Sequence, residues 1–215
     1  MSKEQKKFFQ PVDQLPDSLP IFPLHGVVLL PGAILPLNIF EPRYLNMVED
    51  AMRNNRLIGM IQNPQETDTE ELSEVGCAGR ISHHEKTSDG QIRIVLTGSC
   101  RFKISQELPS LRGYRIIQPD WTSYANDFEK QNVSEDSVIQ FRKTLKQYLL
   151  MNHIEADWNA LEKLEVSELV NNLVMVLPMD ASDKQLLVES SNLEKRVKLF
   201  TSLMNVTAMK TDTRH

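Results

Sequence analysis

Prolines recur through the first apolar region of the chain and limit the secondary structure that it can form. Pro20, Pro23, Pro31 and Pro36 lie among the hydrophobic residues that follow Leu19. A proline inside a helix removes a hydrogen bond and clashes with the preceding turn, and in a sheet it is confined to edges, bends and strand starts. The region is therefore predicted to form short strands joined by tight turns.

One helix is predicted to interrupt this region. Glu41-Pro42 places proline at the first helical position, where it is tolerated, and the helix is expected to end near Asn54-Asn55. Its predicted buried face carries Leu45, Val48 and Met52, flanked by Tyr44 and Ala51.

Further strands are predicted as far as Trp121. Leu57–Ile61 is a short apolar run, and residues 63–74 form a polar, acidic segment that is expected to be a loop. Two β-rich runs, 75–85 and 91–104, flank Asp89-Gly90, a pair that supplies the positive φ of a hairpin turn. Gly98 interrupts the second run, which predicts a bulge or bend there.

The hydrophobic period changes after Trp121. Residues 122–133 show no apolar period and are predicted to be an exposed linker. Beyond them, four helices are predicted, two of which start at the capping-box sequences Ser182-x-x-Gln185 and Ser191-x-x-Glu194. The expected organisation is a polar leader (1–17), a β-domain (18–121), the linker (122–133), a helical bundle (134–209) and a tail (210–215).

The charge is spread evenly and excludes a basic nucleic-acid module. Residues 1–120 hold 13 Lys and Arg against 15 Asp and Glu, within a net charge of −5 for the whole chain. Nucleic-acid affinity comes mostly from cations that neutralise phosphates, so binding to nucleic acid is not expected to be broad. The apolar run Val27–Leu30 ends at Pro31, far short of a membrane span, and a cytoplasmic protein without a membrane partner is predicted.

Motifs for catalysis or metal binding are missing. No glycine is followed by lysine, as a phosphate-binding P-loop requires, and no two glycines are spaced as in a dinucleotide-binding fingerprint. His84-Glu85 lacks the second histidine of a zinc-protease helix, and Cys77 with His83 gives only two ligands on one strand face. Neither a catalytic residue, nor a metal site, nor a cofactor is predicted.

Several ordered motifs carry a resemblance to a known family. The stretch from Leu19 to Tyr44 reads LPIFPLHGVVLLPGAILPLNIFEPRY, and it is followed by Val75-Gly76-x-x-Gly79-x-Ile81, Asp89-Gly90 and Gly98-x-x-Arg101-Phe102-x-Ile104. Near the end come Leu177-Pro178, Asp183-Lys184-Gln185-x-Leu187-x-Glu189 and Glu194-Lys195-Arg196. In this order the motifs resemble the N-terminal substrate-binding domain of Lon proteases.

The resemblance implies an α+β fold, with a PUA-like β-pseudobarrel followed by a C-terminal helical bundle. It also implies a free-standing member of the family without ATPase and peptidase domains. Such a member would be a non-enzymatic module that binds unfolded or peptide segments of other proteins, with a separate protease or chaperone as a candidate partner. An RNA-binding PUA-like module is the alternative.

The Pro31-Gly32 turn is the predicted client-binding segment. Leu29, Leu30 and Ile34 flank it, and apolar residues that a turn exposes can form a binding surface. The sequence leaves open whether clients bind the β-domain or the bundle, and Arg101 is expected to pair within the fold.

We predict that the protein neither hydrolyses ATP nor degrades casein, because it lacks a phosphate-binding lysine loop and a peptidase dyad. Phosphate release and casein fluorescence assays on the purified chain check this. Activity that stays at constant specific rate through successive purification steps would contradict it, once contamination by a full-length Lon protease has been excluded.

Overall fold

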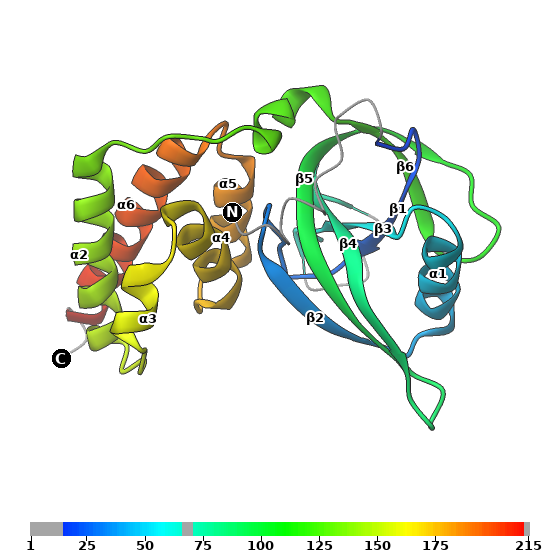
Figure 1. Ribbon diagram of the computed structural model, residues 1–215, viewed down its shortest axis with the longest axis horizontal. Coiled ribbons are helices and arrows are strands. Elements are labelled where there is room, and N and C mark those ends of the chain that lie inside the picture. The colour runs from blue at the N-terminus through cyan, green and yellow to red at the C-terminus, as the bar shows by residue number, and fades with distance from the viewer. Residues whose placement is uncertain (1–14, 66–70, 213–215) are drawn as a thin grey trace.

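The computed structural model describes residues 15–65 and 71–212, with side chains as far as Val206. A β-domain and a helical bundle lie side by side (Figure 1). Most of the predicted leader, the centre of the acidic loop and the last residues of the tail lie outside the described residues.

In the described part of the chain, six strands form the β-domain. They are β1 (Leu19–Pro23), β2 (Ile34–Ile39), β3 (Leu57–Ile61), β4 (Val75–Lys86), β5 (Ile92–Leu108) and β6 (Arg115–Asp120). Pairing runs from β1 through β3, β4, β5 and β6 back to β1, which closes a five-stranded barrel. All these pairs are antiparallel except β1 with β3, and β2 is added outside the ring against the first half of β5. This is the predicted pseudobarrel.

β5 changes partners at the predicted bulge. Before Gly98 one of its edges pairs with β2, and from Lys103 onward β5 pairs with β6. The register against β4 shifts beside Gly98, and a Cβ at this glycine would lie 2.0 Å from the carbonyl oxygen of Leu30. Only glycine allows this approach, so the bend predicted at Gly98 is confirmed.

Helix α1 (Pro42–Arg53) has the predicted bounds but is rotated about its axis. Its buried residues are Tyr44, Met47, Val48 and Ala51, whereas Leu45 and Met52 are only partly buried. The Tyr44 ring packs against Phe22 with a centroid separation of 4.2 Å. With Tyr44 packed in this contact, the buried face of α1 is shifted by about one residue from the face predicted from the aliphatic residues.

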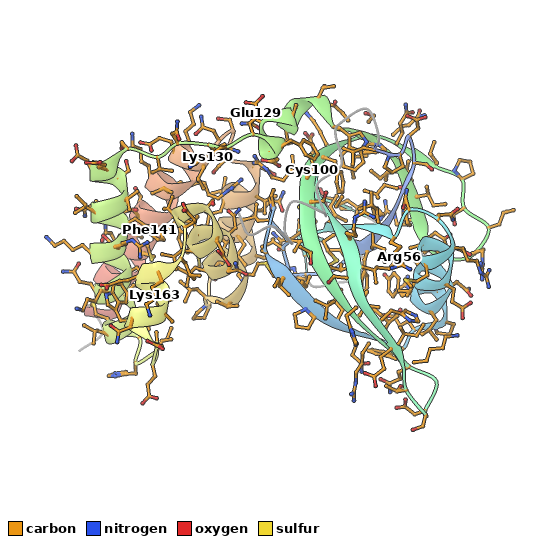
Figure 2. All side chains as sticks on the ribbon, viewed as in Figure 1. Arg56, Cys100, Glu129, Lys130, Phe141 and Lys163 are labelled. Carbon is orange, nitrogen blue, oxygen red and sulfur yellow. The ribbon has the colours of Figure 1, made fainter. Side chains whose placement is uncertain are left out.

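The bundle contains one helix more than predicted. The described residues form α2 (Glu135–Met151), the short α3 (Trp158–Lys163), α4 (Val166–Val176), α5 (Ala181–Glu189) and α6 (Leu193–Asp212). In its core, Phe141 of α2 packs against Phe200 of α6, and Figure 2 labels Phe141. The expected capping serines are displaced: Asp180 is the N-cap of α5, and the Asn192 side chain accepts the Lys195 N–H of α6.

Glu194 joins the first turns of α2 and α6. Its carboxylate accepts hydrogen bonds from the backbone N–H of Ser134 at 3.0 Å and from the Ser137 hydroxyl at 2.9 Å, and it pairs with Lys198 at 2.8 Å. The Lys198 hydrogen bond and these two donors lower the pKa of Glu194 to about 2. The charged form is thus favoured in the folded state.

We predict that Glu194 gives the protein an acid-sensitive part of its stability. Since the folded-state pKa is lowered, the contribution is complete above the ordinary value of 4.5 and is lost as the pH falls towards about 2. Urea titrations from pH 2 to 7 measure the free energy of unfolding. Near neutrality this free energy should be larger for wild type than for Glu194→Gln, and the difference should shrink in acid. The exposed Glu135→Gln serves as control, and a margin that is independent of pH would contradict the assignment.

Candidate functional site

The predicted client segment is a tight turn at Pro31-Gly32. Gly32 has a φ of +77°, and the Ala33 N–H donates to the Leu30 carbonyl at 3.0 Å. The turn leads into β2, and the three predicted residues around it lie in different environments.

Leu29 and Leu30 are both buried. Leu29 packs in the core of the β-domain, where its side chain fills the space above Gly79. Leu30 packs instead with residues of the helical bundle. Neither side chain is available to a client in this structure, so both act as supports of the fold.

Ile34 is the predicted residue that the structure exposes. Its side chain is 59% exposed, and it lies with Pro36 and Asn38 on the outer face of β2. In register beside them on β5 are Thr97 and Val95, both partly buried. We call Ile34, Pro36, Asn38, Val95 and Thr97 the β2 outer face, an apolar centre with polar residues at its margin.

A buried ion pair lies between the β-domain and the bundle. The Arg101 guanidinium of β5 donates to both carboxylate oxygens of Asp127, at 2.7 and 2.9 Å, and both side chains are almost wholly buried. The guanidinium also stacks over the Tyr124 ring, 4.1 Å from its centroid. The expectation that Arg101 pairs within the fold is confirmed.

The ion pair corrects one part of the predicted exposed linker, since the other residues of 122–133 are exposed or partly buried. Residues 122–128 form the 3₁₀ helix η3 (Thr122–Phe128), in which Tyr124 and Asp127 are buried. The sequence shows no apolar period here because the two buried side chains are one carboxylate and one aromatic ring, both of which contact Arg101.

Arg101 also reaches the bundle directly. Its Nη1 donates to the carbonyls of Val188 at 2.8 Å and of Ser190 at 2.5 Å, at the C-terminal end of α5. The last carbonyls of a helix lack partners within the helix and carry partial negative charge. A cation of the barrel therefore caps a helix of the bundle.

Two further buried cations lie nearby. Arg196 of α6 donates to the Leu187 carbonyl and to Asn171, and burial together with the charge of Arg101 lowers its pKa to about 9, so it stays charged near neutrality. Lys184 of α5 donates to the Met175 carbonyl and, across the domain boundary, to the Gly26 carbonyl. We call Arg101, Asp127, Lys184 and Arg196 the junction cluster.

The two thiols and the histidines do not form a reactive site. Burial raises the pKa of both Cys77 and Cys100, and Figure 2 shows Cys100 on β5 near the connection to the helices. Buried, protonated thiols are poor nucleophiles. A register shift beside Ser82 separates Cys77, which is in the core, from His83, which is exposed, and within the described residues His, Cys, Asp and Glu form no cluster of three.

An open groove of about 470 Å³ lies beside the junction cluster. Its walls come from β4, β5, η3 and the end of α5, and they include Tyr124 and Glu189. Lys103 and Glu74 in its lining form an exposed ion pair at 3.0 Å. Its walls mix both charges, and the apolar centre of the β2 outer face is the better surface for an apolar client.

The fold and the motifs agree with a family match that covers most of the chain. Residues 18–206 match the substrate-binding domain of ATP-dependent protease La (LON). This chain belongs to the Lon substrate-binding domain family. The α+β fold, a PUA-like pseudobarrel followed by helices, is the one that the resemblance implied.

Individual relatives show how far the similarity extends. The chain is 26% identical to Lon protease 2 of Myxococcus xanthus and 26% identical to the Lon protease of Haemophilus influenzae, over 90% and 87% of its length. These alignments span 24% of each relative, so the chain corresponds to about a quarter of the curated Lon proteases.

Two solved structures share the fold. A Lon N-terminal domain protein from Xanthomonas campestris aligns with a TM-score of 0.63 and 24% identity, over 86% of this chain and 97% of that one. The N-terminal domain of a Mycobacterium avium complex Lon protease gives 0.65 and 13%, over 87% and 98%. In the described residues, no helix is both long and apolar enough to cross a bilayer.

Asp127 is the structurally important residue that sequence reasoning missed. The sequence does carry a signal, since Tyr124 and Phe128 stand four residues apart on either side of this carboxylate. An arginine in a β-rich run also needs an anion if it is buried. Together the two features indicate a contact between Arg101 and the segment 122–133.

We predict that Asp127→Asn destabilises the protein by roughly 3–5 kcal/mol, because it leaves the Arg101 charge buried without its partner. Chemical denaturation of the variant and of wild type measures this. Asp17→Asn removes the same charge from an exposed position and should change stability by less than about 0.5 kcal/mol. Equal effects of the two substitutions would show that the buried pair has no special role.

Proposed function

We propose that the protein is a non-enzymatic module that binds unfolded or extended segments of other proteins and acts with a separate protease or chaperone. Membership of the Lon substrate-binding domain family over residues 18–206 supports binding of protein substrates. The buried, protonated thiols and the sequence without catalytic motifs support a role in binding alone.

The observation that carries the proposal is the exposed apolar centre of the β2 outer face. Ile34 leaves more than half of its surface in water, and the neighbouring Pro36 is also exposed. Unfolded chains present apolar side chains that a folded protein hides, and covering both surfaces removes apolar area from water. An unfolded client is therefore the partner that gains most from this face.

RNA remains the alternative that binding experiments can separate. The net charge of −5 disfavours broad binding to phosphates, whereas apolar burial does not depend on charge. Binding to RNA should weaken steeply between 50 and 200 mM salt, and binding of an unfolded protein through Ile34 should change little.

We predict that the full chain binds reduced, carboxymethylated α-lactalbumin more tightly than the native, calcium-bound protein. Ile34→Ala should weaken this binding by about fivefold or more, the loss expected for one apolar contact of about 1 kcal/mol. Fluorescence anisotropy with the labelled unfolded protein measures both effects.

Ile139 provides a matched control. It is also an isoleucine, it is 66% exposed, and it lies on α2 in the bundle. Ile139→Ala should bind the unfolded protein as wild type does. If the two variants lose affinity equally the β2 outer face is not the site, and if wild type does not distinguish unfolded from native protein the proposed function is wrong.

A further inference from the structure

β2 has one edge that no described strand covers. Among the described residues it pairs only with β5, and Figure 1 shows it at the margin of the β-domain. A free edge presents backbone N–H and C=O groups that a further strand can bond. The backbone groups that point to this free edge follow from the hydrogen-bonding phase of β2 against β5.

The ladder phase can be read from the turn that enters β2. The Gly98 N–H donates to the Ala33 carbonyl at 2.8 Å, so Ala33 lies at a bonded position against β5. Bonded positions alternate in an antiparallel pair, and therefore Leu35, Leu37 and Ile39 bond to β5. Ile34, Pro36 and Asn38 direct their backbone groups to the free edge.

Pro36 fits this phase. A proline has no N–H and could not serve at a bonded position without breaking the ladder to β5. The edge consequently offers the N–H groups of Ile34 and Asn38 and the carbonyls of all three outward residues. This is a pattern that an extended main chain can match.

The inner side of the edge is apolar and incompletely covered. Leu35 and Leu37 pack against the core of the β-domain but are only partly buried, whereas Ile39 at the end of the strand is buried. A strand added about 4.8 Å away would place alternate side chains beside these leucines and continue the core.

We propose that clients bind by strand addition: an extended polypeptide with apolar residues at alternate positions pairs with the free edge of β2 and covers Leu35 and Leu37. This inference rests on the proposed function and specifies how the client is held. Backbone pairing provides affinity without a fixed sequence, and the two leucines select alternate apolar side chains.

Pro36 argues for a client strand over a second copy of the chain. In a symmetric pair of two β2 strands each copy contributes its own Pro36, so two donors are missing from the new ladder. A client strand without proline loses only one. The edge therefore pairs better with a foreign segment than with itself.

Amide hydrogen exchange of the full chain tests the backbone contact directly. In free protein the amides of Ile34 and Asn38 should exchange fast, while those of Leu35 and Leu37, bonded to β5, exchange slowly and serve as internal reference. On saturation with reduced, carboxymethylated α-lactalbumin, we expect exchange at Ile34 and Asn38 to slow by about tenfold or more.

A pair of substitutions at Asn38 separates backbone from side chain. Asn38→Pro removes the outward N–H, and Asn38→Ala keeps it while losing the same side-chain hydrogen bond to Gln91. The proline variant should bind the unfolded protein about tenfold more weakly, and the alanine variant within about twofold of wild type. The exchange measurement uses wild type and is unaffected if the proline variant folds poorly.

The outcomes distinguish the two proposals. Client binding without protection at Ile34 and Asn38 would overturn strand addition and leave the proposed function intact. Equal binding by both Asn38 variants would also overturn it. If wild type fails to bind the unfolded protein at all, the proposed function falls, and strand addition falls with it.

Discussion

The arrangement of the two parts of this protein depends on one buried guanidinium. Arg101 projects from β5, forms a bidentate pair with Asp127 of η3 and donates to the last carbonyls of α5. A buried charge is costly unless every donor is satisfied, so the positions of strand, connection and helix are mutually constrained. Moving any one of the three would leave a charge or a carbonyl without its partner.

Two neighbouring buried cations also donate to helix ends, and one of their donors, Nη2 of Arg196, has no hydrogen-bond partner among the described residues. Arg196 donates to the Leu187 carbonyl near the end of α5, and Lys184 donates to the Met175 carbonyl near the end of α4. Helix C-termini carry partial negative charge, and so the helix ends take the place of the carboxylates that these cations lack. Apolar packing completes the connection, since Val28, Leu30 and Val75 of the β-domain belong to the core of the bundle. Barrel and bundle therefore share a core as well as a polar network.

Local chemistry made much of the fold predictable. The prolines, the Asp89-Gly90 turn and the bend at Gly98 each act on adjacent backbone, and β3 and α1 have the expected bounds. What failed depends on contacts distant in sequence. Tyr44 of the rotated α1 packs against the Phe22 ring of β1. The burial of Leu30 depends on helices more than a hundred residues away, and Asp127 is buried against an arginine of another element.

For the candidate site the same distinction holds. The sequence predicted a site around Pro31-Gly32. A turn places neighbouring residues on opposite sides, and only the three-dimensional arrangement shows that Ile34 is exposed while Leu29 is not. Periodicity gives the spacing of side chains along one strand. It does not give the layers that cover that strand.

The closed ring of β1, β3, β4, β5 and β6 excludes β2, because β5 divides one edge between β2 and β6. None of the strand pairs that close the barrel includes β2. Detaching this strand would break its bonds to β5 and the contacts of Leu35, Leu37 and Ile39 with the core, but none of the pairs that close the ring. An extended strand added to β2 would therefore lengthen the sheet beyond the barrel without opening the closed ring.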